Sequence, residues 1–159
     1  MEDSIEISFS ELEGCYGQLS SWCDLLEAIA DFIPCQIDER LSDTITNGLI
    51  PLLLTSYRFE ECIFSTERGL IHQGDACERR RTNRSLEYDA AKQVVETLIS
   101  LKEGTCRLSW DIVGDQLRSF IISMRRHIRS ERESIKLIKM PTYEATRCNA
   151  YEVARTEAV

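Results

Sequence analysis

The stretch Arg126-His127-Ile128-Arg129-Ser130-Glu131 is the clearest guide to the architecture, because it places a histidine and a carboxylate four residues apart in a strongly helical segment. Four residues slightly exceed one helical turn, so both side chains project from one face. That face is otherwise apolar, and its residues recur in alternating steps of four and three, the spacing of a buried helix stripe. The stripe consists of Val113, Leu117, Phe120, Met124, His127, Glu131 and Ser134.

An imidazole and a carboxylate that point into a core need partners, because unpaired buried ionisable groups are costly. Metal ligation is one explanation for His127 and Glu131. A hydrogen-bonded polar cluster is the other, and the stretch by itself leaves both open.

Working outward, the chain predicts three further helices before this one. Ser10 and Glu13 have the capping-box spacing that opens a first helix, and Pro34 stops it. A second helix is expected from about Asp38 to Phe64, with a kink or break near Pro51. The inward residues expected on these two helices are Leu12, Tyr16, Leu19, Cys23, Leu26, Ala30 and Ile33, then Thr46, Ile50, Leu53, Tyr57, Glu61 and Phe64.

The region from Ser65 to about Arg81 is polar and contains glycines, which predicts a loop. A third helix is expected from Asn83 or Ser85 to the stop at Gly104, and Ser109 would cap the fourth, which ends near Ile138. The expected inward residues of the third helix are Tyr88, Ala91, Val95, Leu98 and Leu101. These elements predict an all-α, antiparallel up-down-up-down four-helix bundle over residues 1–138, followed by a polar tail at 139–159.

Composition narrows the function. The chain has 159 residues, which suits one domain, and a formal charge of −8, which argues against nucleic acid as the main partner. The run Arg79-Arg80-Arg81-Thr82-Asn83-Arg84 is a local exception, and we interpret it as a solvated run. The acidic start lacks the order of a signal peptide, and no apolar run approaches a membrane span. We therefore expect a cytoplasmic protein without membrane contact, whose seven cysteines are mostly buried small hydrophobes.

The inward positions also collect polar groups. Tyr57 and Glu61 repeat on the second helix the four-residue spacing of His127 and Glu131, and the first and third helices each add one inward tyrosine. The six candidate site residues are Tyr16, Tyr57, Glu61, Tyr88, His127 and Glu131.

Three segments resemble hemerythrin-like proteins, the family with a His-His-Glu cation-binding domain. Residues 23–34, read as Cys-Asp-Leu-Leu-Glu-Ala-Ile-Ala-Asp-Phe-Ile-Pro, are similar to the first helix of that family. Residues 57–64, Tyr-Arg-Phe-Glu-Glu-Cys-Ile-Phe, resemble its second helix, and residues 126–133 resemble its fourth. The likeness covers about residues 9–138.

The resemblance implies a non-haem di-iron site with bridging glutamates. Glu61, His127 and Glu131 match that pattern, whereas tyrosine stands at positions 16, 57 and 88, where the family has histidine. A tyrosine hydroxyl has a pKa near 10 and ligates only after losing its proton, which a hard ion such as Fe(III) favours. We therefore do not expect an intact di-iron site, and expect either no cofactor or one non-haem iron, alternatively zinc.

The metal-free alternative is a closed network in which the three tyrosine hydroxyls and His127 satisfy the carboxylates of Glu61 and Glu131. On this interpretation the protein is a non-catalytic regulatory or interaction protein with a degenerate site. The alternative is a single-metal sensor of iron, oxygen, nitric oxide or redox state that uses Glu61, His127, Glu131 and a tyrosinate. The sequence offers no nucleophile with an adjacent base and no phosphate-binding glycine loop, so we do not expect an enzyme. We expect a protein partner, and this partner could be a second copy of the chain in a homodimer.

Overall fold

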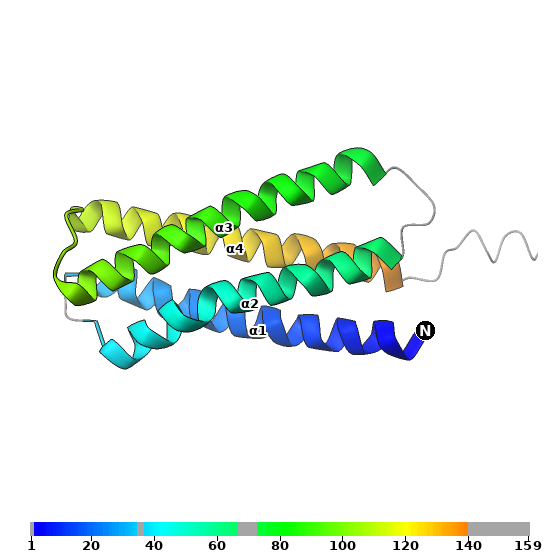
Figure 1. The fold of residues 1–159 in the computed structure, drawn as a ribbon, viewed down its shortest axis with the longest axis horizontal. Helices are drawn as coiled ribbons and strands as arrows, with labels where there is room; N and C mark the ends of the chain where they lie inside the picture. Colours follow the sequence, from blue (N-terminus) through cyan, green and yellow to red (C-terminus); the bar gives the residue numbers. More distant parts are fainter. Residues whose placement is uncertain (1, 35–36, 67–72, 140–159) are drawn as a thin grey trace, which may run out of the picture. The chain divides into compact units, whose positions relative to one another are not determined.

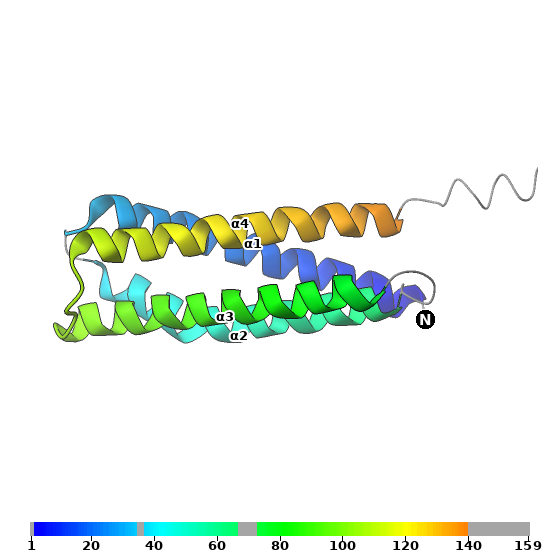
Figure 2. The same ribbon diagram turned by 90° about the horizontal axis from the view of Figure 1, so that it is seen from above.

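The computed structural model describes residues 2–34, 37–66 and 73–139. They form four α-helices: α1 (Glu2–Phe32), α2 (Glu39–Thr66), α3 (Gln73–Glu103) and α4 (Trp110–Lys139). Successive helices run in opposite directions, and Figures 1 and 2 show α1 beside α2 and α2 beside α3. The predicted all-α, up-down four-helix bundle is confirmed.

The chain divides into two compact units, residues 1–128 and 129–159, and the division falls within α4. The first unit holds α1, α2, α3 and the first part of α4, and the features described below belong to it. The described part of the second unit is the end of α4, where the Ser134 hydroxyl donates to the Ser130 carbonyl oxygen at 3.1 Å. Residues 140–159 lie outside the described residues, so the expected tail at 139–159 stays a prediction.

Each helix contributes an apolar stripe to the core of the first unit. On α1 the predicted stripe is confirmed from Leu12 to Ala30, and on α4 it is confirmed from Val113 to Met124. The largest fully buried aliphatic side chains come from all four helices: Leu12, Leu19, Leu26, Ile45, Leu49, Leu53, Ile63, Leu98, Leu117, Ile121 and Met124. Burial of this kind is the main favourable contribution to folding.

Local signals set most helix ends. The Asp38 carboxylate accepts from the backbone N–H groups of Arg40 and Leu41 at 2.8 and 3.2 Å and so caps α2. Gly104 has a φ of 70°, and it ends α3 with the Thr105 N–H donating to the Ser100 carbonyl oxygen at 2.9 Å. This is the Schellman arrangement that a glycine after a helix favours.

Ser109 caps α4 as predicted, since its hydroxyl accepts from the Ile112 N–H at 3.3 Å. Two expected boundaries are wrong. Ser10 lies inside α1, which begins at Glu2. The expected loop to Arg81 is wrong as well, because α3 begins at Gln73 and the arginine run is helical. Arginine, glutamate and alanine are good helix formers, and that propensity outweighs the polar composition that favours a loop.

Pro51 does not divide α2, which is one helix from Glu39 to Thr66. Its ring is exposed, and nearby α2 comes close to α1 at Gly48. A Cβ atom on Gly48 would lie 2.5 Å from the ring of Trp22, so any larger residue here would force the indole ring to move.

Polar contacts join the first part of α4 to its neighbours. Arg125 pairs with Asp24 at 2.7 Å and with Glu27 at 2.8 Å, both on α1. The Thr97 hydroxyl of α3 donates to the Gln116 side-chain oxygen at 2.6 Å. These bonds hold the first part of α4 against both α1 and α3. No described helix is long and apolar enough to cross a membrane.

The described cysteines are free thiols, and they only partly follow the expectation. Cys15 and Cys23 are buried on α1, whereas Cys62 is exposed. Burial raises the pKa of both α1 thiols, that of Cys23 to about 11, so they stay neutral and pack as small apolar groups.

Candidate functional site

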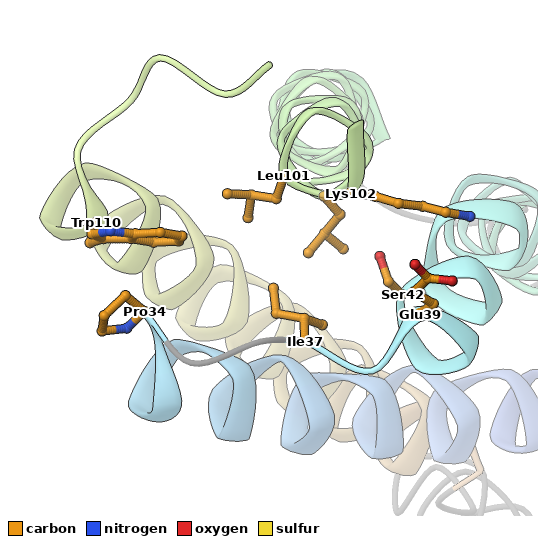
Figure 3. Close-up of a pocket in the computed structure, with 8 residues that line it drawn as sticks. Pro34, Ile37, Glu39, Ser42, Leu101, Lys102 and Trp110 are labelled. Carbon is orange, nitrogen blue, oxygen red and sulfur yellow. The ribbon is translucent and has the colours of Figure 1, made fainter. Parts of the chain in front are cut away.

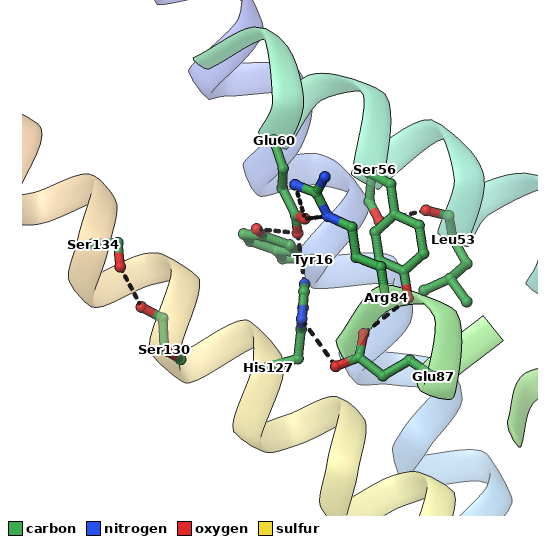
Figure 4. A network of polar contacts seen from close by, with 10 residues as sticks. Tyr16, Leu53, Ser56, Glu60, Arg84, Glu87, His127, Ser130 and Ser134 are labelled. Carbon is green, nitrogen blue, oxygen red and sulfur yellow. Dashed lines mark hydrogen bonds and ion pairs between the residues drawn. The ribbon is translucent and has the colours of Figure 1, made fainter. Parts of the chain in front are cut away.

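A cluster of polar side chains lies inside the first unit, and every helix contributes to it (Figure 4). α1 gives one tyrosine, α2 a tyrosine and a glutamate, α3 an arginine and a glutamate, and α4 a histidine. Its members, which we call the central network, are Tyr16, Tyr57, Glu60, Arg84, Glu87 and His127.

His127 stands at the middle of the central network and uses both of its ring nitrogens. Nε2 lies 2.6 Å from Glu60 Oε1, and Nδ1 lies 3.1 Å from Glu87 Oε1. The two nitrogens point away from each other, so the carboxylates approach opposite edges of the ring. A carboxylate can only accept, and therefore both nitrogens carry protons and His127 is an imidazolium ion.

Glu60 is the most heavily bonded member, and its side chain is fully buried. Besides His127, its Oε1 accepts from the Tyr16 hydroxyl at 2.7 Å. Its Oε2 accepts from Arg84 Nε at 3.2 Å, and the Arg84 guanidinium also pairs with it through Nη2 at 3.2 Å. Both carboxylate oxygens are therefore satisfied without water.

Glu87 completes the other half of the central network. Its Oε2 accepts from the Tyr57 hydroxyl at 2.8 Å, while Oε1 faces His127. The Tyr57 ring packs edge-on against the imidazole with 5.9 Å between centroids, and Arg84 lies 5.5 Å from the centre of the same ring. Tyr57 therefore supports the histidine by packing as well as by its bond to Glu87.

The charges of the central network cancel, because Glu60 and Glu87 face Arg84 and His127. Burial alone would lower the pKa of His127, but the hydrogen bonds to Glu60 and Glu87 outweigh it and raise that pKa to about 10. Burial alone would raise the pKa of Glu60, but the bond to His127 dominates and holds it below its ordinary value. Burial and the neighbouring Glu87 carboxylate raise the pKa of Tyr57 far above its ordinary value, so its hydroxyl keeps its proton.

The structure brings together three of the six predicted residues: Tyr16, Tyr57 and His127. The inward placement of Glu61 is wrong, because this side chain is exposed and Glu60 takes its place. The inward placement of Tyr88 is also wrong, because Tyr88 is half-buried and Glu87 is the residue that points inward.

Glu131 lies on α4 one turn after His127, in the second unit, and its role as a ligand stays a prediction. His72 lies outside the described residues.

Sequence reasoning missed Glu60, Arg84 and Glu87. Both glutamates lie one residue before the predicted position. The predicted residues are Glu61, which lies four residues after Tyr57, and the aromatic residue Tyr88. A signal was available, since Leu53, Glu60, Glu87, Ala91, Val94 and Leu98 follow seven-, four- and three-residue steps on their helices. Burying two carboxylates is costly, so this spacing does not by itself predict that they point inward. In the structure, Arg84 and His127 offset that cost.

The arrangement does not fit the di-iron centre that the resemblance implies. Among the described residues, no group of three or more histidine, cysteine, aspartate or glutamate side chains is placed to hold a metal ion. His127 presents a proton rather than a lone pair to each carboxylate, and Tyr16 donates its proton to Glu60. A ligand nitrogen must be unprotonated, so metal binding would require these bonds to break first.

Comparison with known proteins gives no family for the chain. No family model, no curated protein and no solved structure matches it.

Proposed function

We propose that the chain is a non-catalytic regulatory or interaction module whose interior needs no metal. One observation carries the proposal, the engagement of both His127 nitrogens by Glu60 and Glu87. A histidine held in this way has no free lone pair, and both of its protons are engaged by carboxylates. The central network then acts as a polar layer that fixes the register of the four helices.

The surface supports a role in binding a partner. Several large apolar side chains are exposed on α3 and α4, among them Leu86, Trp110, Ile112 and Ile122. Exposed apolar groups mark a contact surface where they form a patch, so these four residues are candidate contact positions and not a defined interface. The partner we propose is another protein or a second copy of the chain, and sedimentation velocity over a range of concentrations tests the second form.

The family remains part of the proposal. A histidine of α4 at the centre of the bundle supports hemerythrin-like ancestry, and so does tyrosine at the positions of α1 and α2 where that family has histidine. The exposure of Glu61 counts against it, because the family pattern requires that carboxylate inside. We propose descent from a hemerythrin-like bundle in which Glu60 and Glu87 have replaced the metal-binding arrangement.

The test is metal content together with the protonation state of His127. Protein purified without a metal-binding tag should contain less than a tenth of an equivalent of iron or zinc, as measured by mass spectrometry of the metals. The 15N shifts of the His127 ring should be those of imidazolium at pH 7.5, and melting should not change with chelator.

One iron per chain with a phenolate-to-iron band in the visible spectrum would overturn this proposal. It would favour the alternative, a single-metal sensor. Glu60, Glu87 and His127 would then be the ligands to mutate, and not Glu61.

A further inference from the structure

The face of α1 that points away from the core carries no charged residue over most of the length of the helix. Figures 1 and 2 show α1 at one corner of the bundle, with α2 and α4 on its two sides. Eight positions from residue 7 to residue 32 recur in steps of three and four, so they lie along one face, opposite the buried stripe. We call these positions the α1 outer face. Three of them hold large apolar side chains, Ile7, Leu25 and Phe32, and two of these, Ile7 and Phe32, are well exposed. The other five are exposed and small: Ser10, Gly14, Gly17, Ser21 and Ala28.

The lack of charge on the α1 outer face stands out against the rest of the chain. Charged residues make up 29% of the sequence, and a solvated helix face ordinarily includes several of them. Acidic residues are frequent on α1, but they lie beside this face: Glu6, Glu11, Glu13, Asp24, Glu27 and Asp31. Depletion of charge from the centre with charge at the rim is the pattern of a protein–protein contact.

Two glycines lie in the middle of the α1 outer face, where packing within the chain does not explain them. A Cβ atom on Gly14 or on Gly17 would meet no atom within 4 Å, so there is space for a side chain at both positions. Glycine in the middle of a helix is destabilising relative to alanine. A glycine does, however, allow the backbone of another helix to approach closely.

The order of large and small residues makes the α1 outer face complementary to itself. When two copies pair antiparallel about a two-fold axis between positions 19 and 20, Ile7 of each copy lies opposite Phe32 of the other. In the same register Leu25 of each copy lies opposite Gly14 of the other, so a large side chain meets a gap. Small residues then face each other next to the axis, where the helices are closest.

Charge beside the face favours the same orientation. Spacings of 18 and 11 residues place Glu6 and Glu13 on the same side of α1 as Asp24, which pairs with Arg125 of α4 at 2.7 Å. The side chains of Arg118 and Arg125 lie beside the second half of α1 and are still 49% and 36% exposed. Antiparallel pairing brings Glu6 and Glu13 of each copy next to these arginines of the other. Parallel pairing would leave them far apart along the helix.

We propose that the α1 outer face binds the same face of a second copy and forms an antiparallel, two-fold symmetric dimer. The inference rests on the proposed function, because it names the second copy as the partner of the module. Each copy uses its single α1 outer face, so assembly closes at two chains.

Sedimentation velocity of the full chain over a range of concentrations tests the contact. The unaltered chain should pass from monomer to dimer and no further. Gly17→Glu places two like charges next to the axis and should weaken the dimer at least about 10-fold. Ser85→Glu is the matched control, since it adds the same charge at an exposed position of α3, the helix diagonally opposite α1, and should change the Kd less than about 2-fold (Figures 1 and 2).

A second pair of variants tests the antiparallel register. Gly14→Leu fills the gap opposite Leu25 and should weaken the dimer at least about 10-fold, and Leu25→Ala should weaken it about 5-fold. The chain with both changes restores one large and one small residue at each contact, so its Kd should return to within about 3-fold of the unaltered value. Circular dichroism checks that each variant is folded.

A chain that stays a monomer at every concentration overturns this inference, and so does assembly beyond two chains. Folded Gly17→Glu that associates as the unaltered chain does, or Ser85→Glu that weakens the dimer equally, would also overturn it. A failure of the combined Gly14→Leu and Leu25→Ala changes to restore the dimer would overturn the antiparallel register. The proposed function is judged separately, by metal content and the protonation state of His127.

Discussion

The central network and Ser42 of α2 are both places where polar side chains are buried, and they differ in how those groups are satisfied. Ser42 lines a pocket together with Pro34, Leu101 and Trp110 (Figure 3). In the central network each carboxylate oxygen of Glu60 and Glu87 has a donor, and the charges balance. Ser42 is only 4% exposed, but its side chain borders the open space of the pocket, where water can bond to the hydroxyl. A closed set of bonds stabilises one arrangement of helices, whereas a hydroxyl that water can reach contributes little to that choice.

This difference has a consequence for substitution. Removing a group from the central network strands its partners in the interior, so every such change should destabilise the fold. Removing the Ser42 hydroxyl leaves no buried charged group without its partner. The same kind of measurement on the two regions should therefore give effects of opposite sign.

The largest effect is expected from Glu60→Gln. The amide keeps the size of the side chain but removes the negative charge that His127 and Arg84 share. Its NH2 group would also face the N–H donors of these two residues, where a carboxylate oxygen now accepts. Breaking a buried charge pair in this way costs about 3 kcal/mol of unfolding free energy. Chemical denaturation at pH 7 measures it.

Glu61→Gln is the matched control, since Glu61 is the adjacent residue and is exposed. It should change the unfolding free energy by less than about 0.5 kcal/mol. Equal costs for the two variants would contradict the assignment of Glu60, rather than Glu61, to the interior.

The contrast between Glu60 and Glu61 shows how far the sequence led. On α4 the stripe from Val113 to His127 was predicted residue by residue, because apolar residues there outnumber ambiguous ones. On α2 and α3 the period was right but the phase was wrong by one residue at Glu60 and Glu87. Helical steps of three and four both keep a residue near one face, so a pattern cannot separate neighbours when one is an aromatic and the other a carboxylate.

What resolves the choice is a contact between helices. Glu60 can be buried only because His127, 67 residues later, and Arg84, 24 residues later, supply charge at the same place. Such long-range pairing is invisible to helical periodicity. The pocket was missed for a related reason, since it depends on where the ends of three helices meet.

The next effect is a loss of stability at mildly alkaline pH. The pKa of His127 is raised from 6.5 to about 10 in the folded chain, so its stabilising contribution is fully present below pH 6.5 and declines as the pH rises toward 10. Between pH 6.5 and 8.5 the unfolding free energy should fall by about 2 kcal/mol from this group. Urea denaturation across that range measures the fall.

The range stops at pH 8.5 because the buried thiols contribute with the same sign above it. Cys23 has a folded pKa of about 11, so its contribution too declines once the unfolded thiol ionises. His127→Gln is the control, and its stability should be lower throughout but nearly flat from pH 6.5 to 8.5. A slope that persists in this variant would mean that another group is responsible.

The smallest effect has the opposite sign and concerns the pocket. Ser42→Ala removes a hydroxyl that borders the pocket, and it places the best helix former at this position within α2. The gain in helix propensity should stabilise the fold by up to about 0.5 kcal/mol. Ser56→Ala is the matched change on the same helix, because Ser56 is 1% exposed and its hydroxyl donates to the Leu53 carbonyl oxygen at 2.7 Å. That variant should be neutral or less stable in thermal unfolding. If Ser42→Ala proved the more damaging of the two, the hydroxyl would already be satisfied in the free protein, and the distinction between a closed centre and an open pocket would fail.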